Sequence, residues 1–151
     1  DSHNNRLQIF DARDGIYVRS IGNGRGAAPN QFAFPSGVAV LPNGRVIVAD
    51  SGNKRLQIVD PADGTFHATL QGKGFEAFDC PFGVTVLANG DVVVCDFGTC
   101  SLHVVDVAKG CIVLTIGNAG GVAFELNGRA LPQLGPSGTV IKQMVLPPEG
   151  P

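Results

Sequence analysis

An internal repeat limits the folds open to this chain more than any other feature of its sequence. A motif of the form Asp-x-x-Asn-x-Arg-Leu-Gln-Ile-x-Asp opens the chain and then recurs. Its copies span residues 1–11, 50–60 and, with weaker identity, 96–106. Residues 35–40 also align with residues 81–86, and agreement at so many offsets is hard to obtain by chance. The chain is therefore predicted to consist of similar units of 46–49 residues.

Each unit has the pattern of four short strands joined by tight turns. In the second unit we expect strands over residues 38–41, 45–49, 55–59 and 66–70. Asn43-Gly44 is a strong hairpin signal, because both residues tolerate positive φ. In the turn at residues 60–64, an aspartate can accept from the backbone and a glycine can take the left-handed position. One unit is therefore predicted to be a four-stranded antiparallel meander.

The first two strands of each unit are almost continuously apolar, as in residues 46–49. A sheet that is buried on both faces has this pattern. The chain is also rich in glycine, with 21 of 151 residues, and only 16% of its residues are charged. Four-stranded sheets with neighbours on both sides, repeated at this period, are typical of a β-propeller. A β-sandwich would show shorter turn spacing and no identity at this period.

The second unit resembles the NHL repeat. Residues 34–40 and 43–58 carry the resemblance, which extends with decreasing similarity over residues 1–121. In the third copy, Thr99 and Ser101 stand where the second has Asn and Arg. NHL repeats form six-bladed propellers. The resemblance implies an all-β fold of four-stranded antiparallel blades, here a partial ring of about three blades.

The units divide the chain into successive blades. Residues 1–34 would hold strands three and four of a first blade with a connection, residues 35–80 a second blade, residues 81–121 a third, and residues 122–151 a long connection with the first strand of a fourth. Half a ring leaves sheet faces and strand edges open to water. We therefore expect either a protein longer than this chain or a homodimer in which two chains close one ring.

The recurring polar residues of the motif are expected to be structural. They are Asp1, Asn4, Arg6, Asp50, Asn53, Arg55 and Asp96. Asp50 and Asn53 can hold their loop through hydrogen bonds to the backbone. Arg55 can pair with a carboxylate of its own or the next blade. In the third copy Ser101 replaces the arginine, which indicates that other groups stabilise this loop in the third blade. Contact of the motif residues with a ligand is the alternative to a structural role.

The connections between the fourth strand of one blade and the first strand of the next are the candidate functional surface. We expect them at the same end of the ring as the loop at residues 50–54, and irregular loops on a rigid scaffold often carry function. The candidate binding residues are Asn23, Arg25, Lys54, Lys73 and Asn118. The three cations would make this face locally positive, and the alternative is a merely solvated rim. The glycines of residues 22–26 lack the strand-loop-helix context of a phosphate loop.

Aromatic, histidine and cysteine residues receive structural interpretations. The family resemblance implies that the phenylalanines before the first strands pack between blades, and an exposed patch that binds a partner is the alternative; they are Phe32, Phe34, Phe75, Phe78 and Phe82. His103 stands where the other copies have Gln, so we expect a tolerant polar position. The cysteines, Cys80, Cys95, Cys100 and Cys111, are too few for a disulfide scaffold. Free buried thiols are expected; a Cys95–Cys100 disulfide and a zinc site with His103 are the alternatives.

Composition and charge exclude several functional classes. The chain is too apolar, at 44%, to be disordered, and its net charge of −2 gives no general attraction to nucleic acid. No apolar run reaches the roughly 18 residues of a membrane span. The absence of a glycosylation sequon favours an intracellular location.

No catalytic triad, metal ligand set or cofactor is expected from the sequence. The family resemblance implies a non-catalytic scaffold that binds a protein partner through its loops. The alternatives are half of a metal-dependent six-bladed enzyme, similar to lyases or lactonases, and an RNA-binding propeller.

Overall fold

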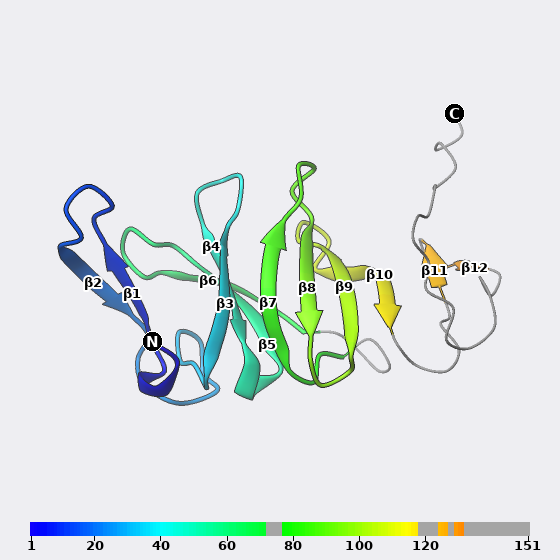
Figure 1. Ribbon diagram of the computed structural model, residues 1–151, viewed down its shortest axis with the longest axis horizontal. Coiled ribbons are helices and arrows are strands. Elements are labelled where there is room, and N and C mark those ends of the chain that lie inside the picture. Colours follow the sequence, from blue (N-terminus) through cyan, green and yellow to red (C-terminus); the bar gives the residue numbers. More distant parts are fainter. Residues whose placement is uncertain (72–76, 118–123, 127–128, 132–151) are drawn as a thin grey trace.

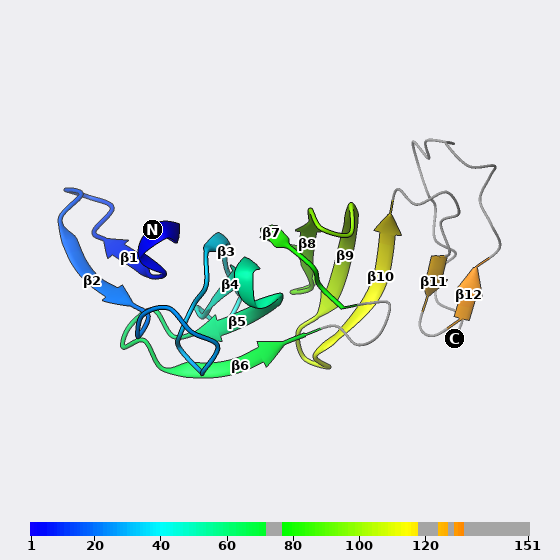
Figure 2. The same cartoon turned by 90° about the horizontal axis from the view of Figure 1, so that it is seen from below.

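The structure, a computed structural model, describes residues 1–71, 77–117, 124–126 and 129–131. These residues form antiparallel sheets and two short 3-10 turns, η1 (Ser2–Asn4) and η2 (Ser51–Asn53). No helix among them is long and apolar enough to cross a membrane. The sheets follow one another in a row and do not close into a ring (Figures 1 and 2). The predicted all-β, propeller-type fold is confirmed.

The order of the strands in each sheet follows the order in the sequence. The first sheet pairs β1 (Leu7–Phe10) with β2 (Tyr17–Ile21). The second has β3 (Pro35–Val40), β4 (Val46–Asp50), β5 (Arg55–Val59) and β6 (Phe66–Leu70). The third has β7 (Pro81–Val86), β8 (Val92–Asp96), β9 (Ser101–Asp106) and β10 (Cys111–Gly117). A short pair, β11 (Phe124–Leu126) and β12 (Arg129–Leu131), follows within the predicted connection; the predicted strand of a fourth blade lies outside the described residues.

In the second sheet, the observed strand bounds and turns can be compared with those predicted from the sequence. β5 and β6 have the predicted bounds, whereas β3 begins at Pro35 because this residue already pairs with Asp50 across a bulge. The hairpin between β3 and β4 differs from the expected turn. Only Gly44 has positive φ, and its N–H donates to the Leu41 carbonyl at 2.9 Å. This is a turn over residues 41–44 that ends in a left-handed glycine.

Two apolar clusters join the sheets. One lies between the first and second sheets and includes Ile21, Phe32 and Val48. The other lies between the second and third sheets and includes Ile47, Leu56 and Val94. Because neighbours cover both of its faces, every residue of β4 and β5 is buried. The continuous apolar runs of the sequence have this cause.

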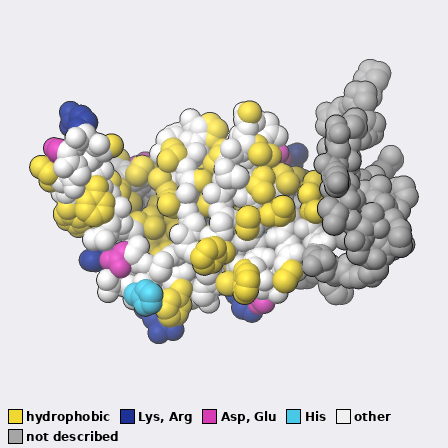
Figure 3. Space-filling model, in the orientation of Figure 1, with side chains coloured by type: hydrophobic (Ala, Val, Ile, Leu, Met, Phe, Trp, Pro, Cys, Tyr) yellow, Lys and Arg dark blue, Asp and Glu magenta, His cyan; other side chains and the backbone are white. Residues whose placement is uncertain are grey.

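Serine hydroxyls also connect successive sheets, and they do so at equivalent positions of the repeat. Ser2 donates to the carbonyl of Pro35, and Ser51 donates to the carbonyl of Pro81. The equivalent residue in the third sheet is Phe97, which is exposed. Figure 3 shows hydrophobic side chains exposed on this side of the molecule, over the β1–β2 sheet and over the strands beside it.

Gly37 lies where the backbones of the second and third sheets approach closely. A methyl group on Gly37 would lie 2.9 Å from the backbone nitrogen of Val84 and nearer still to the carbonyl oxygen of Phe82. Gly83 is the equivalent residue of β7, where a methyl group would meet only the Cys95 side chain, at 3.6 Å from its sulfur. The two glycines share a sequence context and differ only in what packs against them.

Gly37→Ala is expected to lower the free energy of unfolding by about 1–3 kcal/mol, because the methyl group must push β7 away from β3. Gly83→Ala should change it by less than about 0.5 kcal/mol, because the methyl group makes an ordinary contact. Urea unfolding of both variants measures the difference. Equal effects of the two substitutions would contradict the close approach.

Candidate functional site

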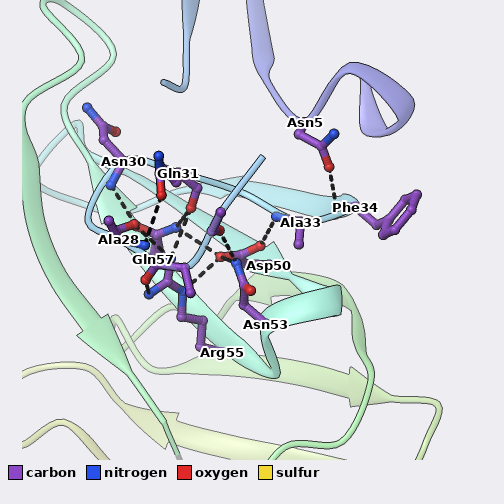
Figure 4. A network of polar contacts seen from close by, with 12 residues as sticks. Asn5, Ala28, Asn30, Gln31, Ala33, Phe34, Asp50, Asn53, Arg55 and Gln57 are labelled. Atoms are coloured by element: carbon purple, nitrogen blue, oxygen red, sulfur yellow. Dashed lines mark hydrogen bonds and ion pairs between the residues drawn. The ribbon is translucent and has the colours of Figure 1, made fainter. Parts of the chain in front are cut away.

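The carboxylate of Asp50, at the end of β4, is fully buried and lies at the centre of a polar network (Figure 4). Its Oδ1 accepts the backbone N–H of Ala33 at 2.7 Å. Its Oδ2 accepts from Asn53 Nδ2 at 2.9 Å, from Arg55 Nε at 2.8 Å and from Gln57 Nε2 at 3.0 Å. Four donors thus satisfy one buried charge, and the Arg55 guanidinium neutralises it.

The donors that remain on these side chains hold the connection between β2 and β3, residues 22–34. Arg55 donates to the carbonyls of Ala27, Ala28 and Gln31 at 2.7, 3.1 and 2.9 Å. Asn53 Nδ2 donates to the carbonyl of Gly26 at 2.7 Å. The motif loop and this connection therefore lie at one end of the sheet.

The first copy of the motif makes the same side-chain pairs in a more exposed setting. Arg6 Nε donates to Asp1 Oδ2 at 2.8 Å, and Asn4 Nδ2 donates to Asp1 Oδ1 at 2.9 Å. The Arg6 side chain is 40% exposed, whereas that of Arg55 is 7% exposed. No connection covers Arg6 in the described part of the chain.

The third copy satisfies its aspartate with backbone groups. Asp96 accepts the N–H groups of Asp79 and Cys80 at 2.8 and 2.9 Å, and those of Gly98 and Thr99 at 3.0 and 3.2 Å. Asp96 is buried like Asp50, although no arginine reaches it. Backbone amides therefore brace the third blade where the second uses Arg55.

His103 does not occupy the tolerant polar position that the sequence suggested. It is 1% exposed, its Nδ1 lies 2.9 Å from Thr115 Oγ1, and its ring packs edge-on against Phe78. Its Nε2 lies 3.8 Å from Asp96 Oδ2. Burial lowers the pKa of His103, and the nearby Asp96 carboxylate acts in the opposite direction. Gln57 is equally buried, whereas the equivalent Gln8 is exposed, so the recurrence of a polar residue at this position does not by itself indicate burial.

The candidate binding residues lie around the motif loops but do not form a cluster of free cations. Asn23 and Arg25 are exposed on the connection, and the Arg25 guanidinium lies 5.2 Å from the centre of the Phe34 ring. Lys54 forms an ion pair with Asp79, whose hydrogen bond and charge raise the pKa of the lysine. Lys73 and Asn118 lie outside the described residues.

The expected packing of the phenylalanines holds for two of the five. Phe32 and Phe78 are buried between sheets, whereas Phe34 and Phe82 are exposed and Phe75 lies outside the described residues. The prediction was wrong for Phe34 and Phe82 because the sequence does not show which positions the neighbouring sheet covers.

Phe34 has an unusual backbone for its residue type. Its φ is +50°, and its N–H donates to Asn5 Oδ1 at 2.9 Å (Figure 4). Bulky residues rarely adopt positive φ, and residues before proline normally prefer extended backbone. Asn5, in the loop before β1, therefore holds the backbone of Phe34, whose aromatic side chain is exposed, in this conformation.

All four cysteines are free, but the expected burial was wrong for Cys95, Cys100 and Cys111, which are exposed. Cys80, Cys95 and Cys100 line an open apolar groove of about 870 Å³ on the face of the β7–β10 sheet that carries Phe82, Leu102 and Ile116. No group of three or more potential metal ligands gathers among the described residues.

Comparisons with known proteins agree with this architecture. Residues 32–59 match the model of the NHL repeat. No curated protein matches the chain.

Many solved structures share its fold, and two of them serve as examples. Hydrazine synthase of Kuenenia stuttgartiensis matches with a TM-score of 0.61 and 18% identity, over 77% of this chain and 30% of that chain. A catalytically inactive virginiamycin B lyase from Staphylococcus aureus, with quinupristin, matches with a TM-score of 0.58 and 14% identity, over 77% of this chain and 35% of that chain. This chain thus spans about a third of either protein.

Asp50→Asn is expected to lower the free energy of unfolding by about 3–5 kcal/mol, because it leaves the buried Arg55 charge without a counter-ion. Asp1→Asn should cost less than about 1 kcal/mol, because its ion pair with Arg6 is more exposed. Urea unfolding compares the two. Similar losses in the two variants would show that burial does not determine how much the aspartate–arginine pair stabilises the fold.

His103 is expected to make the fold less stable in mild acid. The pKa of His103 is lower in the folded chain than in the unfolded chain. The neutral side chain therefore makes its full contribution to the free energy of unfolding above the unfolded pKa of about 6.5. That contribution falls as the pH drops from there towards the folded pKa, because only the unfolded chain binds the proton readily. Thermal unfolding between pH 8 and 5 tests this, with His103→Gln as the control; an unchanged profile in the variant would contradict it.

Proposed function

We propose that this chain, which belongs to the NHL-repeat β-propellers, binds a protein partner through a loop face formed by residues 22–34 and 50–54. The exposed pair of Phe34 and Arg25 is the observation that carries this proposal. Aromatic and arginine side chains contribute most of the binding energy at many protein interfaces. A partner that covers the ring would bury its apolar surface, while the guanidinium supplies hydrogen bonds at the rim.

The surroundings of this pair support a binding role because they hold it in place before a partner arrives. Positive φ at a bulky residue costs of order 1–3 kcal/mol, and surrounding contacts must stabilise it. Asn5 supplies such a contact to Phe34. The connection that carries Arg25 is bonded to Arg55 and Asn53 of the buried network. A preorganised loop loses less conformational entropy on binding.

The alternative functions have less support from the described residues. The solved structures of similar fold include a synthase and a lyase, but identity of 14–18% is evidence of fold alone. RNA binding would need a broad basic surface, and here Lys54 is paired with Asp79. A protein partner is therefore the favoured interpretation.

A photo-crosslinking amino acid in place of Phe34 tests the proposal. We expect it to crosslink one discrete protein in extracts of the source cells, and Arg25→Ala should weaken that crosslink at least fivefold without changing thermal stability. The same amino acid in place of Tyr17 is the matched control, because Tyr17 is an exposed aromatic residue on β2. Equal products at both positions, or crosslinks mainly to RNA, would contradict the proposal.

A further inference from the structure

A cleft of about 600 Å³ lies between the second and third sheets, at the end opposite the motif loops. The β3–β4 and β7–β8 hairpins, which point upwards in Figure 1, form two of its walls. Strands β5 and β6, the end of β9 and the turn after it complete the lining. All of these residues belong to the described part of the chain. Clefts of this size commonly hold small ligands.

The floor of the cleft is apolar. Leu41 and Ile58 are buried members of the apolar cluster between the two sheets. Ala68 of the second sheet and Val107 of the third pack against that cluster. A hydrophobic group placed on this floor would be removed from water, which favours its binding. The floor can therefore hold the apolar part of a ligand.

The two hairpin walls carry opposite charges at equivalent positions of the repeat. The N–H of Leu41 donates to the Arg45 carbonyl at 2.8 Å, and the N–H of Leu87 donates to the Asp91 carbonyl at 2.8 Å. The same turn is thus closed by Arg45 in one sheet and by Asp91 in the next. Both residues line the cleft, and both are partly buried. One wall therefore presents a cation and the other an anion.

The other charged groups of the lining already have partners. Asp106 Oδ2 accepts from Lys109 Nζ at 2.9 Å, and this hydrogen bond lowers the pKa of Asp106. The same hydrogen bond is the main cause of the raised pKa of Lys109, to which the charge of Asp91 also contributes. His67 Nε2 lies 4.0 Å from Asp60 Oδ2. A ligand therefore meets Asp106 and His67 as groups that face a counter-charge or its carboxylate.

Arg45 and Asp91 differ from these groups because they lack an ionic partner. Neither forms an ion pair, with the other or with a third residue, in the part of the chain that the structure describes. Asp91 Oδ2 accepts from Asn89 Nδ2 at 2.8 Å, which is a neutral donor. A guanidinium group presents a fork of donors that matches a carboxylate. The walls therefore offer one place for an anionic group and one for a cationic group.

We propose that this cleft binds a short zwitterionic peptide with an apolar side chain. The Arg45 guanidinium donates to the peptide's terminal carboxylate, the Asp91 carboxylate accepts from its terminal ammonium group, and the side chain lies on the floor. A peptide fits better than a single amino acid because the two charges stand on separate sheets, and each added residue moves the termini apart by up to about 3.5 Å. This inference does not depend on the loop face or on its partner, which lie at the other end of the sheets.

The dipeptide Ala-Leu is the probe, in an NMR titration that follows the backbone amides of the full chain. Saturable shifts are expected at Gly44 and Gly90, which lie in the two hairpin walls, and no shift at Gly52 beside the motif loop. A dissociation constant of about 1 mM or lower is expected for a ligand of this size. No saturable shift at the hairpin glycines, or equal shifts at Gly52, would overturn the proposal.

Blocked peptides separate the contributions of the two charges. N-acetyl-Ala-Leu lacks the ammonium group and Ala-Leu amide lacks the carboxylate, so each should bind at least fivefold more weakly than Ala-Leu. Asp91→Asn should weaken Ala-Leu but not the acetylated peptide, and Arg45→Gln should weaken Ala-Leu but not the amide. Arg13→Gln is the matched control, because Arg13 is exposed and pairs with Asp11 in the turn after β1. Equal weakening by the control, or unequal treatment of the wrong peptide, would contradict the assignment.

An exchange of the two charges tests whether they act as a pair. Arg45→Asp alone and Asp91→Arg alone should each reduce Ala-Leu binding at least tenfold, because one wall then repels a terminus. The double variant has both charges again, and it should recover binding to within threefold with the peptide reversed. Amide shifts elsewhere in the spectrum report whether each variant is folded. A folded double variant that binds as weakly as the single variants would overturn the proposal.

Discussion

The buried carboxylate of Asp50 is the contact on which the arrangement of this chain depends. Burial of an isolated charge is strongly unfavourable, so the fold must supply a counter-ion and enough donors. The donors come from the turn that follows β4, from β5 and from the connection before β3. Formation of this one site therefore orients segments that are distant in the sequence, including the connection that carries Arg25.

The aspartates of the three motif copies differ in their burial and in the groups that donate hydrogen bonds to them. Asp50 is buried with an arginine, Asp1 has the same partner nearer to solvent, and Asp96 relies on backbone amides. The third solution leaves room beside Asp96 for His103, whose imidazole has replaced an amide side chain. The repeat thus preserves the position of the carboxylate, while its donors are arginine and amide side chains in two copies and backbone amides in the third.

The same dependence on neighbours explains where interaction surfaces arise. Phe34 is exposed, but its backbone conformation is held by Asn5, which lies between η1 and β1. Val38 and Val40 are exposed because no described segment packs over them, while their equivalents in β7 pack against the core. Exposed apolar groups therefore have two origins here: a loop face whose conformation the fold fixes, and a sheet face that no described sheet covers.

The sequence by itself determined the repeat, the all-β propeller architecture, the bounds of β5 and β6, and the pairing partners available to Arg55. These features depend on local turn chemistry and on a pattern of side chains that recurs within the chain. Exposure was not determined in the same way. His103 was expected at a tolerant position and is buried, whereas Phe34, Phe82 and three cysteines were expected inside and are exposed. Only the tertiary structure decided these cases, because the burial of a strand residue depends on whether another sheet packs against its face.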